Sequence, residues 1–291
     1  MALWPRKRTT DTDTRPARRA VTPSADLTPA RTAVIVRGRG SVISLAKTGQ
    51  GTINMRKGAQ AAYDSLTAAG LLGIRAKGRL WIDRSGSMGT DFREGRVQDL
   101  AEMVLAFMFQ FTASVEVRFW DTVVHPPFVL TVDNYRGAIA REHAKLPRMG
   151  STDMAGALEL LRALMSEGEP ELSFDVVLSD GNPDDFRRNY NAEDGDAPGT
   201  AKQTTAMVCD LARYPTQIKF VGIRETDYLQ MLDDLEDYQP GARLVDNVDT
   251  KIYPDGLASI TPEQFSADMT DEWDTWIAAA TAAGVLQEST P

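Results

Sequence analysis

The sequence predicts an α/β protein with a doubly wound, mainly parallel sheet, flanked by helices and carrying one antiparallel hairpin at its edge. From Arg79 onward, strand-like and helix-like segments alternate, which is the order expected of parallel strands joined by crossover helices. Residues 174–178 form a nearly continuous apolar run, typical of a strand buried on both faces. Residues 114–120 and 128–132 flank a short turn and predict the hairpin.

The elements of the main domain follow from apolar spacing, helix caps and turn residues. We expect a strand at 79–82, a helix from Asp91 to 111, strands at 114–120 and 128–132, a short helix from Asp133 to His143, a helix at 154–165, a strand at 174–178, a helix at 200–213, a strand at 217–223, a helix at 226–235 and a strand at 242–245. These elements place the domain at residues 79–250.

Shorter units are expected on both sides of this domain. Residues 41–78 predict a small attached element, with a hairpin made of the strands 42–47 and 52–55 and a helix at 58–70. Residues 251–291 predict a helical extension, because Thr261-Pro262-Glu263 is a strong helix start.

Charge and composition restrict the class of protein. The chain has 291 residues with 32 basic and 41 acidic side chains, a net charge of −9 that disfavours general nucleic-acid binding by the folded body. Residues 1–40 carry nine basic and three acidic side chains, and their low apolar content predicts a disordered arm. An electrostatic role for this arm toward an acidic partner remains open. The single cysteine, the absence of a long apolar run and the absence of an apolar leader predict a cytoplasmic protein without a membrane span.

Three oxygen-rich stretches predict a metal site. Asp83, Ser85 and Ser87 follow the first core strand, Thr152 precedes a helix, and Asp180 follows the central strand. Parallel strands bring their carboxyl ends to one edge of the sheet, where ligands bind. Carboxylate and hydroxyl oxygens suit a hard divalent cation. Each stretch alone could be only a turn or a helix cap, so the prediction depends on their combination.

These motifs resemble the von Willebrand factor A (vWA) domain, a Rossmann-like fold. Its metal-ion-dependent adhesion site has the form Asp-x-Ser-x-Ser, then Thr, then Asp, which matches the five residues above. The stretches Gly70-Leu71-Leu72-Gly73, residues 92–98 and residues 179–185 are further similar to the vWA proteins of bacterial tellurium-resistance and stress-response clusters. Arg84 departs from the family pattern, because a cation stands where an apolar residue is usual. It either points away and pairs with an acid, or weakens metal binding, and Asp153 is a candidate to offset it.

The resemblance implies a binding module and no enzyme. Its divalent cation, Mg²⁺ first with Mn²⁺ or Ca²⁺ as alternatives, would bridge the site to an Asp or Glu of a protein partner, in a tellurium-resistance-like stress response. The alternative is a Mg²⁺-dependent phosphoesterase or nucleotide hydrolase that uses the same site. That chemistry needs a general base, and the sequence offers no clear one near the site. The two histidines, His125 and His143, also lack the partner spacing of metal ligands.

Overall fold

The computed structural model describes residues 27–43, 55–181, 201–224 and 226–289. It contains a six-stranded sheet of order β5-β4-β3-β6-β7-β8. The strands are β3 (Lys77–Asp83), β4 (Val115–Trp120), β5 (Phe128–Leu130), β6 (Ser173–Ser179), β7 (Thr216–Gly222) and β8 (Val248–Ile252). Every pairing is parallel except β4 with β5, which is antiparallel. The predicted fold class, including its hairpin edge, is confirmed.

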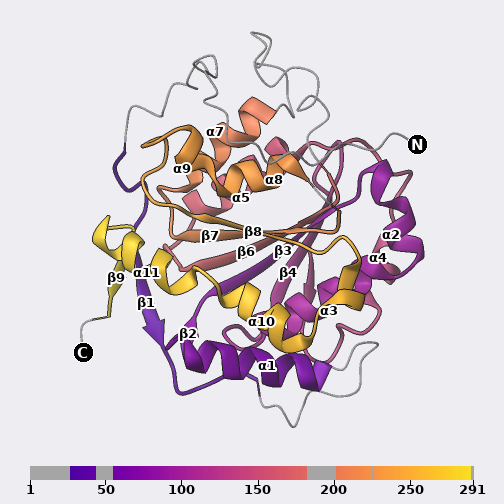
Figure 1. The fold of residues 1–291 in the computed structure, drawn as a ribbon, viewed down its shortest axis with the longest axis horizontal. Coiled ribbons are helices and arrows are strands. Elements are labelled where there is room, and N and C mark those ends of the chain that lie inside the picture. The colour runs from indigo at the N-terminus through magenta and orange to yellow at the C-terminus, as the bar shows by residue number, and fades with distance from the viewer. Residues whose placement is uncertain (1–26, 44–54, 182–200, 225, 290–291) are drawn as a thin grey trace, which may run out of the picture.

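Helices cover both faces of this sheet (Figure 1). On one side lie α5 (Met154–Ser166), α7 (Ala201–Leu211), α8 (Asp227–Asp233) and α9 (Leu235–Tyr238), and on the other lie α1 (Met55–Ala68), α3 (Arg96–Met108) and α10 (Pro262–Thr270). The remaining helices are α2 (Gly89–Arg93), α4 (Ala138–His143) and α11 (Trp273–Ala282). Alternate residues of β3 serve the two faces, because Leu80 and Ile82 enter one apolar core and Trp81 enters the other.

A second, three-stranded sheet has the order β2-β1-β9. Its strands are β1 (Ala33–Arg37), β2 (Ile74–Arg75) and β9 (Leu286–Glu288), with β1 antiparallel to β2 and parallel to β9. The prediction that residues 1–40 are disordered is therefore wrong for residues 33–37. Ala33 and Ile35 are fully buried, whereas Val34 and Val36 are about half exposed. This two-residue alternation stabilises β1 despite the basic composition around it.

Two further expectations differ from the structure. Residues 242–245 form bends instead of a strand, and the edge strand β8 begins at Val248. The Arg243 guanidinium donates to the carbonyl oxygens of Leu232 and Asp233, both at 3.4 Å, so this segment packs against the end of α8. The helix expected from Asp91 to 111 is divided into α2 and α3 by Gly95, whose φ of 80° lies in the left-handed region. The expected hairpin at 42–55 lies almost entirely outside the described residues.

The packing of β1 predicts a difference between two neighbouring positions. Ile35→Ala is expected to lower the free energy of unfolding by about 2–5 kcal/mol, because Ile35 is fully buried between β2 and β9. Val36→Ala, at a position 54% exposed in the same strand, is expected to change it by about 0.5 kcal/mol or less. Urea unfolding of the full chain measures both values. Equal effects would contradict the docking of β1.

Candidate metal centre

The site is built on the carboxyl end of β3. Asp83 ends this strand and is fully buried. Its Oδ1 accepts a hydrogen bond from the Ser85 amide at 2.7 Å, and its Oδ2 accepts one from the Ser179 hydroxyl at 2.6 Å. Burial raises the pKa of Asp83 to about 7, although these hydrogen bonds act in the opposite direction. The carboxylate is thus fixed in orientation and holds a costly charge that a cation would stabilise.

A chain of polar contacts joins this strand end to β6. The Ser85 and Ser87 hydroxyl oxygens lie 3.0 Å apart, and the Ser87 hydroxyl donates to Asp180 Oδ1 at 2.9 Å. Ser85 is buried and Ser87 is exposed, so the chain leads from the interior to the surface. Burial also raises the pKa of Asp180, against the hydrogen bond from Ser87 and the nearby charge of Arg224. The strand ends coincide because β3 and β6 are adjacent parallel strands.

Thr152 reaches the same edge through its loop. The Gly86 amide donates to the Gly150 carbonyl oxygen at 2.9 Å, which places the loop before α5 beside the loop after β3. A Cβ added to Gly150 would lie 2.4 Å from the Thr122 hydroxyl oxygen, so glycine lets this loop pack closely against Thr122. Thr152 itself is 9% exposed. Of the five predicted ligands, hydrogen bonds connect Asp83, Ser85, Ser87 and Asp180, while Thr152 is linked only by the position of its loop.

Arg84 points away from these oxygens. Its buried guanidinium donates to Asp121 Oδ2 at 2.6 Å and also to the Pro147 carbonyl oxygen. Burial would raise the pKa of Asp121, but hydrogen bonds from His125, the Val123 amide and Arg84 hold it below its usual value. The acid that pairs with Arg84 is therefore Asp121, and not the neighbouring Asp153.

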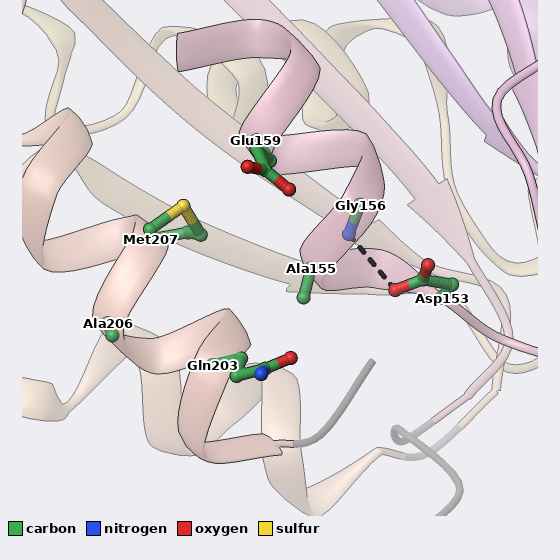
Figure 2. Close-up of a pocket in the computed structure, with 7 residues that line it drawn as sticks. All are labelled: Asp153, Ala155, Gly156, Glu159, Gln203, Ala206 and Met207. Carbon is green, nitrogen blue, oxygen red and sulfur yellow. Dashed lines mark hydrogen bonds between the residues drawn. The ribbon is translucent and has the colours of Figure 1, made fainter. Parts of the chain in front are cut away.

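Asp153 instead caps α5 and borders a pocket (Figure 2). Its Oδ1 accepts a hydrogen bond from the Gly156 amide at 3.0 Å, which satisfies a donor of the first helical turn. The pocket lies between α5 and α7 and has a volume of about 300 Å³. Its lining combines two acidic side chains and one amide with small or apolar ones, namely Asp153, Ala155, Gly156, Glu159, Gln203, Ala206 and Met207. Asp153, the residue after Thr152, is the member of this lining that lies next to a predicted metal ligand in the sequence.

Arg224 is a member of the site that the sequence reasoning missed. It lies two residues beyond β7, the strand next to β6. Its guanidinium lies 3.2 Å from Asp180 Oδ2 and 2.7 Å from Asp91 Oδ2. The signal was present in the sequence, because Arg224 follows a predicted strand end directly.

The other polar candidates do not contact this cluster. His125 lies 3.2 Å from Asp121 Oδ2, and His143 stacks on Phe92 with ring centroids 3.9 Å apart. Burial and the charge of Arg84 lower the pKa of His143. Burial raises the pKa of Cys209 to about 11, which disfavours its reactive thiolate form. The acidic residues Asp184, Asp185, Glu193, Asp194 and Asp196 follow Asp180 in the sequence but lie outside the described residues.

A second acidic group was not predicted from the sequence. Carboxylate oxygens of Asp233, Asp249 and Glu272 lie within 4.8 Å of one another. Lys219 and Lys251 both pair with Asp249, the latter at 3.1 Å. Two lysines on one carboxylate neutralise much of the charge that a cation would need.

The residues at the edge of β3 and β6 fit a hard divalent cation. They offer two carboxylates and three hydroxyls, the oxygen ligands that Mg²⁺, Mn²⁺ and Ca²⁺ prefer. Asp180 Oδ2 is buried, and among the described residues it accepts no contact with hydrogen-bond geometry, although it forms an ion pair with Arg224 at 3.2 Å. This incompletely satisfied carboxylate oxygen is the atom of the site that most favours a further cation.

Comparison with known proteins identifies one family. The vWA-TerF-like family, described as the vWA found in the TerF C terminus, matches residues 75–286. The match thus includes β3 and β6 and extends beyond residue 250, where the sequence placed the end of the domain. The uncharacterized protein YcbR of Bacillus subtilis (strain 168) is 24% identical over 228 residues, which cover 75% of this chain and 84% of YcbR.

Solved structures show only distant likeness. A mutant of the PilB minor pilin from Streptococcus sanguinis has a TM-score of 0.41 at 14% identity over 71% of this chain, and the chain covers 62% of that protein, less than two thirds. Manganese-loaded TRAP of Plasmodium vivax has a TM-score of 0.39 at 15% identity, covering 65% of this chain and 73% of that one. None of the helices in the described part of this chain combines the length and apolar character needed to cross a membrane.

Proposed function

This chain belongs to the vWA-TerF-like family, and we propose that it is a metal-dependent protein-binding module. Asp83, Ser85, Ser87, Thr152 and Asp180 would hold a divalent cation, with Mg²⁺ as the first candidate. The ion would supply a coordination position for an Asp or Glu carboxylate of a protein partner. We also propose a place in a tellurium-resistance-like stress response, on the motif resemblance found in the sequence.

One observation carries the proposal. Asp83 ends β3 and Asp180 directly follows the adjacent strand β6. The Ser85 amide, the Ser85 hydroxyl and the Ser87 hydroxyl connect the two carboxylates. Burial raises the pKa of both carboxyls, so each ionised group lacks the stabilisation that water would give it. A divalent cation among these oxygens would supply that stabilisation.

The chemistry of the site supports binding over catalysis. A hydrolase needs a general base within reach of its nucleophile. Among the described residues, His125 and His143 hydrogen bond or stack elsewhere, and Asp83 is engaged by Ser85 and Ser179. Arg224 would provide the cation that a hydrolase requires, so turnover has to be measured directly.

Two measurements test the proposal together. The full chain, immobilised, is expected to retain an acidic protein partner in Mg²⁺ and to release it in a chelator. With Mg²⁺ and either ATP or a generic phosphate ester, the wild-type chain is expected to show no more turnover than the Asp83→Asn variant. Binding that survives chelation, or turnover that Asp83→Asn abolishes, would contradict the binding-module function.

A further inference from the structure

Arg224 lies against one carboxylate oxygen of Asp180, a predicted metal ligand. Its two terminal nitrogens contact three acceptors: Asp180 Oδ2 at 3.2 Å, Asp91 Oδ2 at 2.7 Å and the Ser87 carbonyl oxygen at 3.1 Å. Two of these acceptors belong to predicted metal ligands. The chain therefore brings its own cation to the carboxylate of Asp180, which the proposed function assigns to a metal, and to the backbone of Ser87.

Asp91 anchors this arginine. Asp91 is fully buried, and its Oδ1 also accepts a hydrogen bond from Arg96 at 3.0 Å. Its contact with Arg224 is the shortest of the three and has hydrogen-bond geometry. The contact with Asp180 is longer, and within the described part of the chain Asp180 Oδ2 accepts no contact with hydrogen-bond geometry. A metal ion could thus replace Arg224 as the partner of Asp180, and Asp91 would still hold Arg224 next to the site.

We infer that Arg224 is a tethered competitor of the metal ion, which makes metal binding depend on an acidic ligand. This inference rests on the proposed function. Without a ligand, a divalent ion beside Asp180 faces the positive charge of Arg224 within a few ångströms, which weakens its binding. The side chain of Arg224 is 42% exposed, so a ligand can reach it.

A ligand carboxylate would offset the repulsion between the metal ion and Arg224. One of its oxygens would bind the ion while the other accepted a hydrogen bond from Arg224, because guanidinium groups match carboxylates well. Metal and acidic ligand would then each strengthen the binding of the other, since coupling between two binding sites is reciprocal. The metal occupancy of the site would remain low until an acidic partner bound.

Calorimetric titration of Mg²⁺ into the full chain tests this inference. It is run in sodium chloride and in sodium acetate at equal ionic strength, with acetate as the carboxylate probe. For the wild type we expect tighter Mg²⁺ binding in acetate. For Arg224→Gln we expect Mg²⁺ binding in chloride to tighten by about 3- to 10-fold, a range moderated by the partial exposure of the side chain. Acetate is expected to add little to the affinity of this variant.

Arg93→Gln is the matched control. Arg93 is exposed on α2 near the site and contacts Thr90, so its loss changes net charge without touching Asp180. It is expected to retain the wild-type response. Arg224→Lys keeps the charge without the planar fork and is expected to bind Mg²⁺ in chloride within about 2-fold of the wild type.

The outcomes separate this inference from the function on which it rests. Unchanged Mg²⁺ affinity in Arg224→Gln would overturn the competition, and weaker affinity would show that Arg224 instead positions Asp180 for the ion. Either result leaves the metal site standing if the wild type binds Mg²⁺ and Asp83→Asn does not. No Mg²⁺ binding by the wild type or by Arg224→Gln in either salt would overturn both proposals.

Discussion

Asp175→Ala is expected to lower the free energy of unfolding by about 3–5 kcal/mol, because it leaves a buried arginine without its counter-ion. Asp175 is fully buried on β6, and Arg79, 3% exposed, lies 3.3 Å from its Oδ2. The carboxylate also accepts hydrogen bonds from Trp81 Nε1 at 3.0 Å and from the Thr216 hydroxyl at 2.8 Å. The substitution therefore leaves several buried donors without an acceptor.

Urea unfolding measures this loss, and an exposed ion pair is the control. Glu288→Ala removes the partner of Arg37 at the surface, where both side chains are about half exposed, and is expected to cost less than about 1 kcal/mol. Adding Arg79→Met to Asp175→Ala should recover part of the loss, since it removes the unpaired charge. A loss in Asp175→Ala no larger than that in Glu288→Ala would contradict the assigned role of this buried pair.

Asp83→Asn is expected to remove the stabilisation of the protein by Mg²⁺. For a wild-type protein at 100 times the dissociation constant, that stabilisation is about 2.7 kcal/mol. The metal-free variant should be at least as stable as the wild type. Asparagine is neutral at a buried position that raises the pKa of Asp83 to about 7, and it can still accept the Ser85 amide hydrogen bond. Thermal unfolding in Mg²⁺ and in chelator measures both effects.

Asp153→Asn makes the same change of charge one residue from Thr152. Its side chain caps α5, a role that asparagine also performs, so this variant is expected to retain the response to Mg²⁺. A full response to Mg²⁺ in Asp83→Asn, or its loss in Asp153→Asn, would place the ion elsewhere.

The dependence of these effects on pH has a defined sign. Burial raises the folded-state pKa of Asp83 from 3.8 to about 7, so the metal-free folded state binds more protons than the unfolded state between these values. The contribution of Asp83 to metal-free stability therefore falls as pH rises through this range. Metal binding requires the ionised carboxylate. Stabilisation by Mg²⁺ should thus be larger at about pH 8 than at about pH 5.5, and Asp83→Asn should lack this difference.

Local sequence patterns predict the strands that carry Asp83 and Asp180. Asp83 directly follows an apolar run and Asp180 comes two residues after one, and parallel strands bring their ends to one edge of the sheet. The order of strands in the sheet cannot be predicted from local sequence patterns. Arg224 could be seen to follow a strand, but only the adjacency of β7 and β6 brings it to Asp180. Arg84 likewise pairs with Asp121, which follows β4, the other neighbour of β3.

The strand β1 shows a different limit of local patterns. Its five residues lie in a basic segment with few apolar side chains, and a lone strand of that length has no reason to order. Its partners are β2, nearly forty residues later, and β9, near the far end of the chain. Ala33 and Ile35 are buried in the core that these strands share. The residues near β1 in the sequence do not include these partners, so local patterns cannot predict this burial.

The pairing of β1 with β9 has a mechanical consequence. The two strands are parallel, with Ala33 opposite Leu286 and Ile35 opposite Glu288. The chain enters the pair at Ala33 and leaves it at Glu288, which are opposite ends along the strand axis. Tension applied through the two ends of the chain would therefore load this pair in shear, so that its hydrogen bonds resist together instead of opening one after another.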